Sequence, residues 1–155
     1  MLGKLIVSFL ISASPFGEMK IGLPFALHAH VNDVVALIFC IAGNLMVYPI
    51  VDYLMVNYGA RLFKSNKIKR KAVWVKIHTK SKTKDLVQKY GFWGLMFFVM
   101  IPVPGTGAYL GTVAAYIFDI DKAKAFKAIS LGVVFSGILL YAVIKGALKG
   151  ISFFF

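Results

Sequence analysis

The sequence predicts an all-α integral membrane protein built from two inverted repeats, each a re-entrant helical hairpin followed by a transmembrane helix. Hydrophobic residues make up 59% of the chain and its mean hydropathy is +0.79. A soluble domain of this size cannot bury so much apolar surface. Two long apolar runs are each preceded by an apolar stretch that proline and glycine interrupt. Such matching interrupted segments are typical of transporters with a site near the bilayer midplane.

Two uncharged runs are long enough to be transmembrane helices. The run Val34–Val51 carries no charge and continues past Asp52 to Ala60. At about 1.5 Å per residue, such a helix crosses a hydrocarbon core about 30 Å thick. We therefore expect one transmembrane helix over 34–60 and a second over 126–148.

Each expected helix follows an interrupted stretch. Breakers divide 14–31 at Pro15, Gly17, Gly22 and Pro24, and divide 92–118 at Pro102, Pro104, Gly105, Gly107 and Gly111. Neither stretch keeps an unbroken helix long enough to cross a bilayer. A broken backbone at membrane depth is tolerated only where protein or a wet cavity satisfies its free N–H and C=O groups. We therefore expect both stretches to be re-entrant, with their tips facing each other.

The two halves align with a shift of 89 residues, which places Gly22 on Gly111 and Gly43 on Gly132. We expect a single membrane domain over 1–155, with the first repeat at 1–60 and the second at 90–155. The segment Met1–Ser14 resembles a secretory signal and is too short to cross alone. We expect it to be a structural part of the first repeat.

Positive charge is concentrated between the two repeats. Eleven of the 18 Lys and Arg residues lie in 61–89, against the single acid Asp85. The positive-inside rule therefore predicts a cytoplasmic 61–89 loop in a multi-pass protein of the plasma membrane. We expect this loop to contact anionic lipid headgroups. No second polar domain accompanies it, so we do not expect nucleic-acid binding.

Two short pieces resemble a known family. Gly17–Pro24 reads G-E-M-K-I-G-L-P and Ile101–Ala108 reads I-P-V-P-G-T-G-A. Both resemble the small multidrug export protein family, which is distantly similar to the DedA and VTT-domain membrane proteins; the motif P-x-P-G-T-G-A is the more specific piece. The resemblance implies two opposed re-entrant hairpins and movement of a substrate across the membrane. It also implies a functional acid in the first hairpin, which Glu18 matches, and functional arginines in the second, although no Arg follows Arg70.

Glu18 is the strongest single candidate for function. It is the only Glu in the chain and lies between two helix breakers in a segment expected at membrane depth. A buried ionisable residue there is costly and is a functional candidate by default. The alternative is that Glu18 caps the helix that follows it. Lys20, two residues later, points elsewhere on a regular helix and meets Glu18 only in an irregular tip.

The second tip suggests anion binding. The N–H groups of Gly105, Thr106 and Gly107, with the Thr106 hydroxyl, precede a helical run and could hold a phosphate or carboxylate. The alternative is that these glycines only allow the chain to turn and pack. The expected substrate- or proton-binding residues are Glu18, Lys20, Pro24, Asn44, Pro102, Pro104, Gly105, Thr106 and Gly107. We expect no metal site, no cofactor and no catalytic residue, and hence no enzyme.

The expected function is transport by a homodimer. The substrate would be amphiphilic or anionic, with a lipid-linked phosphate as the first choice and coupling to protons. Three alternatives remain open: export of a cationic small molecule, lipid scrambling, and a membrane scaffold without transport activity.

Overall fold

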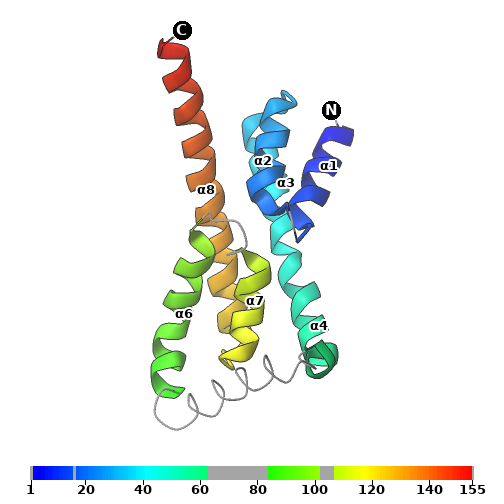
Figure 1. Ribbon diagram of the computed structural model, residues 1–155, viewed down its shortest axis with the longest axis vertical. Coiled ribbons are helices and arrows are strands. Elements are labelled where there is room, and N and C mark those ends of the chain that lie inside the picture. The colour runs from blue at the N-terminus through cyan, green and yellow to red at the C-terminus, as the bar shows by residue number, and fades with distance from the viewer. Residues whose placement is uncertain (1, 16, 63–83, 102–106, 155) are drawn as a thin grey trace.

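The computed structural model describes residues 2–15, 17–62, 84–101 and 107–154, and all regular structure in these ranges is α-helical. The helices are α1 (Leu2–Ala13), α2 (Glu18–His28), α3 (Asp33–Leu45), α4 (Val47–Leu62), α6 (Lys84–Met100), α7 (Ala108–Ile117) and α8 (Lys122–Phe154) (Figure 1). Two helical stretches are long and apolar enough to cross a membrane, Asp33–Tyr58 and Lys122–Ala147. The expected all-helical chain with two candidate spans is therefore confirmed. The predicted loop 61–89 is too long at both ends, because 61–62 belong to α4 and 84–89 to α6. The rest of it, 63–83, lies outside the described residues.

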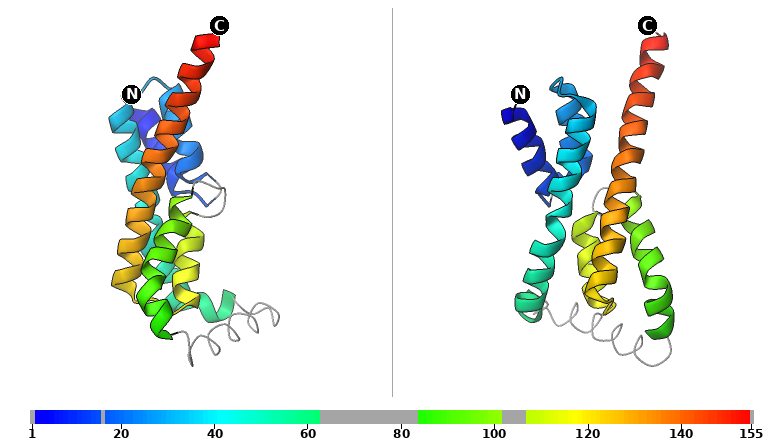
Figure 2. Two further views of the ribbon diagram at one scale, coloured as in Figure 1. Left: turned by 90° about the vertical axis from the view of Figure 1, so that its left-hand side faces the viewer. Right: turned by 180° about the vertical axis from the view of Figure 1, so that it is seen from behind.

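The shorter helices form two pairs that point in opposite directions. Helices α1 and α2 run antiparallel and pack along α3, whereas α6 and α7 pack along α8. In Figure 1 the first pair lies in the upper half of the molecule and the second pair in the lower half, and the views in Figure 2 show the same arrangement. The turn after α1 and the start of α7 therefore lie near the middle of the molecule.

The first long helical stretch is bent where α3 passes into α4. A turn at Met46 separates the two helices. Pro49 follows Leu45 by one helical turn, lacks the N–H that would bond to the Leu45 carbonyl, and its ring crowds that carbonyl. Proline therefore explains this interruption, whereas α8 contains no proline and is one continuous helix.

The connection from α2 to α3 and the connection from α7 to α8 have the same hydrogen bonds. In the first, the N–H groups of Ala29, His30 and Val31 donate to the carbonyls of Phe25, Leu27 and Ala26; in the second, those of Phe118, Asp119 and Ile120 donate to Ala114, Tyr116 and Ala115. Every residue in the second set follows its counterpart by 89 positions. His30 and Asp119 also share a left-handed backbone, with φ of 55° and 56°.

The start of the next helix is repeated as well. The Asn32 side chain accepts a hydrogen bond from the Val35 N–H at 3.3 Å, and the Asp121 side chain accepts one from the Lys124 N–H at 3.1 Å. Both side chains satisfy N–H groups that a helix start leaves without a partner. The same cap therefore begins α3 and α8.

In each half, a glycine on the long helix brings it close to one of the short helices: Gly43 on α3 faces α1, and Gly132 on α8 faces α6. A side-chain carbon at Gly43 would lie 2.6 Å from the Phe9 carbonyl oxygen, and one at Gly132 would lie 2.8 Å from that of Met96. Met96 follows Phe9 by 87 positions rather than 89. Helix α6 therefore follows α1 by 87 positions, whereas α7 and α8 follow their counterparts α2 and α3 by 89.

Polar contacts connect the two long helical stretches near both of their ends. The Asp33 carboxylate accepts a hydrogen bond from the Tyr141 hydroxyl at 2.8 Å and pairs with Lys145 at 2.7 Å. The Asp52 carboxylate pairs with Lys122 at 2.9 Å. Lys122 follows Asp33 by 89 positions, and Tyr141 follows Asp52 by the same number. The start of each stretch therefore contacts the far part of the other, so α8 runs antiparallel to α3 and α4.

The glycine contacts give a test of this packing. We expect Gly43→Ala and Gly132→Ala each to lower the free energy of unfolding by about 1–3 kcal/mol, because the added methyl group meets a backbone carbonyl. Gly146→Ala is the matched control, since a side-chain carbon there has no neighbour within 4 Å. Unfolding in mixed detergent micelles measures the effect. Equal stability of all three variants would contradict the close packing.

Candidate functional site

Glu18 lies at the turn that joins α1 to α2. The turn is closed by hydrogen bonds from the Gly17 N–H to the Ser14 hydroxyl at 2.9 Å and from the Glu18 N–H to the Ser14 carbonyl at 3.1 Å. Glu18 has a φ of 46°, a left-handed conformation that costs an L-residue about 1–2 kcal/mol. Its exposed fraction is 4%. The first acid of α2 is therefore buried in a strained turn.

The Lys20 ammonium pairs with this buried carboxylate. The Lys20 Nζ and Glu18 Oε2 atoms are 2.6 Å apart, and the side chains are 14% and 5% exposed. Residues two apart do not face each other on a regular helix, but the left-handed Glu18 begins α2 irregularly. A close opposite charge offsets part of the cost of burying a carboxylate. The two predicted residues therefore meet, as expected only for an irregular tip.

Gly107 places the second tip directly against Glu18. Gly107 precedes α7 as its N-cap residue, and a side-chain carbon there would overlap both carboxylate oxygens of Glu18. The start of a helix carries partial positive charge, which favours a nearby carboxylate. The Glu18 carboxylate therefore faces α7 and Lys20.

Tyr109 gives a second contact between the two tips, and the sequence analysis did not find it. The Tyr109 hydroxyl donates to the Ala13 carbonyl at 2.6 Å. Ala13 ends α1, where the carbonyls lack partners within the helix. The sequence contains one signal for this role, because Tyr109 follows Lys20 by 89 positions. Both residues thus place a polar group at a tip.

The other predicted residues are not joined to this group. Pro24 lies inside α2, six residues beyond Glu18. Asn44 is 4% exposed on α3, and its side-chain oxygen has no hydrogen-bond partner among the described residues. The remaining candidates, Pro102, Pro104, Gly105 and Thr106, lie outside the described residues. In the described part of the chain, no three His, Cys, Asp or Glu residues form a group that could hold a metal ion.

Comparison with known protein families shows to which of them the chain is related. A model of the family described as putative small multi-drug export protein matches residues 18–139. The chain belongs to this family. The matched region starts at Glu18 and includes Gly107 and Tyr109. No curated protein and no solved structure matches the chain. The family and the two apolar helical stretches together indicate a membrane protein associated with transport.

The contact between Glu18 and Gly107 predicts a coupled pair of substitutions. We expect Gly107→Ala to lower the free energy of unfolding by about 1–3 kcal/mol, because the new methyl group displaces a carboxylate that Lys20 holds. In a Glu18→Ala background the carboxylate is absent, so Gly107→Ala should cost much less, with a coupling energy of about 0.5–3 kcal/mol. Unfolding of the four proteins in mixed micelles gives this value. A cost of Gly107→Ala that is the same in both backgrounds would show that the tips do not meet there.

Proposed function

We propose that this protein is a proton-coupled transporter of an anionic amphiphile in the plasma membrane. The observation that carries the proposal is the ion pair of the buried Glu18 and the partly buried Lys20, in which Glu18 lies against Gly107 where the two helix pairs meet. An ionisable group at membrane depth is costly and is a functional candidate for that reason. The family match supports a role in export.

In this proposal, the α1–α2 and α6–α7 pairs are re-entrant hairpins of an inverted repeat. The repeated hydrogen bonds of the α2–α3 and α7–α8 connections support it. The opposite directions of the two pairs support it as well. Helices α1, α2, α6 and α7 have 12, 11, 17 and 10 residues, whereas a helix needs about 20 to cross a bilayer. A short helix pair that enters the membrane and returns to the same side agrees with the short helices and with the opposite directions of the two pairs.

The charge pattern supports one orientation. The basic segment 61–89 follows α4 in the sequence, and the exposed Lys124 and Lys127 lie in the first turns of α8. The end of α4 and the start of α8 lie at the same end of the molecule. With this end in the cytoplasm, both basic segments obey the positive-inside rule. The α1–α2 hairpin would then enter from outside, and the α6–α7 hairpin from the cytoplasm.

The proposed mechanism exchanges one anion for another beside Lys20. Protonation of Glu18 removes its charge and weakens its pairing with the Lys20 ammonium. A phosphate or carboxylate of the substrate then takes the position of the Glu18 carboxylate, between the three N–H donors of Lys20 and the start of α7. One proton accompanies one negative charge, so the site stays neutral in both states and no lone charge is buried.

The ion pair of Glu18 and Lys20 disfavours the alternative that the protein exports a cationic small molecule. A cationic substrate that approached Glu18 would meet the Lys20 ammonium at the same carboxylate, and like charges at one site repel. The substrate would have to displace Lys20 first. An anionic substrate needs no such step once Glu18 is protonated.

Vesicle transport tests the proposal. We expect reconstituted protein to move a fluorescent single-chain alkyl phosphate when a pH gradient is imposed. Glu18→Gln keeps the shape of the side chain but cannot cycle between charged and neutral states, so uptake should fall to the level of protein-free vesicles. Asp52→Asn is the matched control, because this acid pairs with Lys122 far from Glu18 in the chain, and its uptake should stay near that of the native protein.

Three results would contradict the proposal. Unchanged uptake by a folded Glu18→Gln variant would remove Glu18 from the mechanism. Movement of tetraphenylphosphonium but not of the alkyl phosphate would favour a cation exporter. Movement of the alkyl phosphate that does not depend on the pH gradient or on Glu18 would favour a scramblase.

A further inference from the structure

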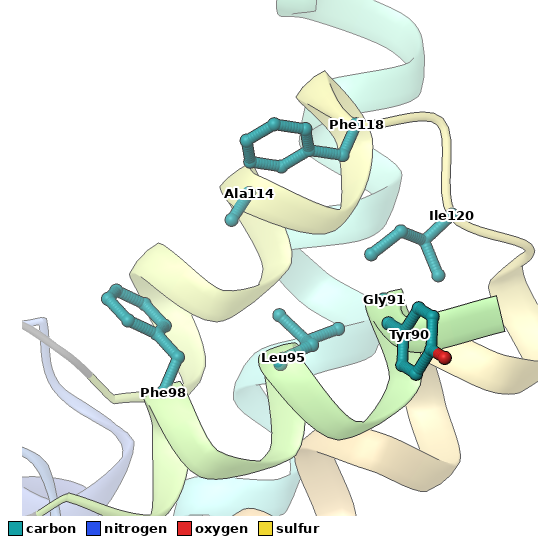
Figure 3. Close-up of a pocket in the computed structure, with 8 residues that line it drawn as sticks. Tyr90, Gly91, Leu95, Phe98, Ala114, Phe118 and Ile120 are labelled. Atoms are coloured by element: carbon teal, nitrogen blue, oxygen red, sulfur yellow. The ribbon is translucent and has the colours of Figure 1, made fainter. Parts of the chain in front are cut away.

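An apolar groove lies between α6 and α7 on the outer side of the second helix pair. Its volume is about 720 Å³, within the range of about 300–1,000 Å³ that is usual for ligand sites. Figure 3 shows Tyr90, Leu95 and Phe98 on α6 facing Ala114 and Phe118 across it. The groove therefore extends along α6 from Tyr90 to Phe98 and lies against the last part of α7.

The groove is open because α6 has glycines where α1 has side chains. A side-chain carbon at Gly94 would have no neighbour within 4 Å, and Gly91 also lines the groove. With the offset of 87 positions that relates α1 to α6, the counterparts of Gly91 and Gly94 are Lys4 and Val7. Lys4 donates from α1 to the Ala29 carbonyl at the end of α2, at 3.1 Å. The corresponding gap in the first pair is therefore bridged, and the second is open.

The surroundings of the groove call for a hydrocarbon occupant. Tyr90, Trp93 and Phe97 on the outer side of α6 are 57%, 54% and 51% exposed. In a membrane protein, such a face lies against lipid rather than water. Water is not stable in a cavity without polar groups, so a chain of methylene groups fits this groove better.

The charge at one end of the groove selects among lipids. The groove begins at Tyr90, directly after Lys89, and includes Ile120, two residues before Lys122. The two segments that adjoin the groove in the sequence, 84–89 and 119–127, together contain five Lys residues against three Asp residues, Asp85, Asp119 and Asp121. Lys124 and Lys127 are exposed at the start of α8. A headgroup at this end therefore meets net positive charge.

We propose that the groove binds one acyl chain of an anionic phospholipid, with the headgroup at the basic end beside Tyr90 and Ile120. The chain extends along α6 towards Phe98, close to the end of this helix. The lipid has the orientation of an ordinary lipid of the leaflet in which the basic end lies. This binding does not depend on transport through the Glu18 site.

Native mass spectrometry of the purified protein tests this site. The protein is titrated in detergent with dioleoyl-phosphatidylglycerol or with dioleoyl-phosphatidylcholine. We expect the anionic lipid to bind more tightly by about fivefold for each lysine near its headgroup. Lys124→Gln with Lys127→Gln should remove much of this preference while binding of the phosphatidylcholine stays unchanged.

Two variants fill the groove from opposite walls. Gly94→Leu adds a side chain from α6 and improves helix propensity, and Ala114→Phe copies Phe25, its counterpart in the first pair. Each should weaken phosphatidylglycerol binding about tenfold, the contribution of roughly two buried methylene groups. Gly3→Leu and Gly146→Leu are matched controls at open positions outside the groove.

The outcomes separate the possible occupants. Loss of binding in either filled variant, with binding retained in both controls, supports the site. Native affinity for phosphatidylglycerol in both filled variants would overturn it, as would equal binding of the two lipids to the native protein. A filled variant that changes the oligomeric state without changing lipid binding would show that a second copy of the chain covers the groove.

Discussion

The Glu18 carboxylate lies between the Lys20 ammonium and the backbone of Gly107, and this contact joins the two halves of the chain. It requires a left-handed Glu18, an irregular first turn of α2 and a second tip without a side chain. Gly107 itself follows Glu18 by 89 positions. The two halves therefore meet at equivalent positions, one occupied by an acid and the other by the residue that leaves room for it.

The rest of the fold keeps these two tips in place. Each tip ends a short helix pair, and each pair packs along a long helical stretch through glycines such as Gly43 and Gly132. The long stretches are joined to each other through Asp33 and Asp52. Lipid cannot satisfy the N–H and C=O groups of a broken helix, so the proposed position of the tips at membrane depth requires that protein covers them. Contact between the tips meets this need, and the Tyr109 hydroxyl does so directly for the carbonyl of Ala13.

The sequence predicts the parts of this arrangement that depend on local chemistry. Apolar run length predicts both candidate spans, and the position of a lone acid between helix breakers predicts the burial of Glu18. The ion pair of Glu18 with Lys20 depends on the left-handed φ of Glu18. The two-residue spacing between them does not predict this backbone conformation. The sequence does not predict that α1 is the partner helix of α2, because α1 matches α6 only with an offset of 87 positions. The Tyr109 contact depends on tertiary packing between segments 96 residues apart, which no local pattern encodes.

Cysteine accessibility tests the opposed hairpins most directly. In a Cys40→Ser background, single variants Lys76→Cys, Lys124→Cys and His30→Cys are treated with a membrane-impermeant maleimide from each side of the membrane. We expect Lys76→Cys and Lys124→Cys to react from one side of the membrane and His30→Cys to react from the other. Reaction of Lys124→Cys from the same side as His30→Cys would mean that the α6–α7 segment crosses the membrane, and the two tips could not then meet within it.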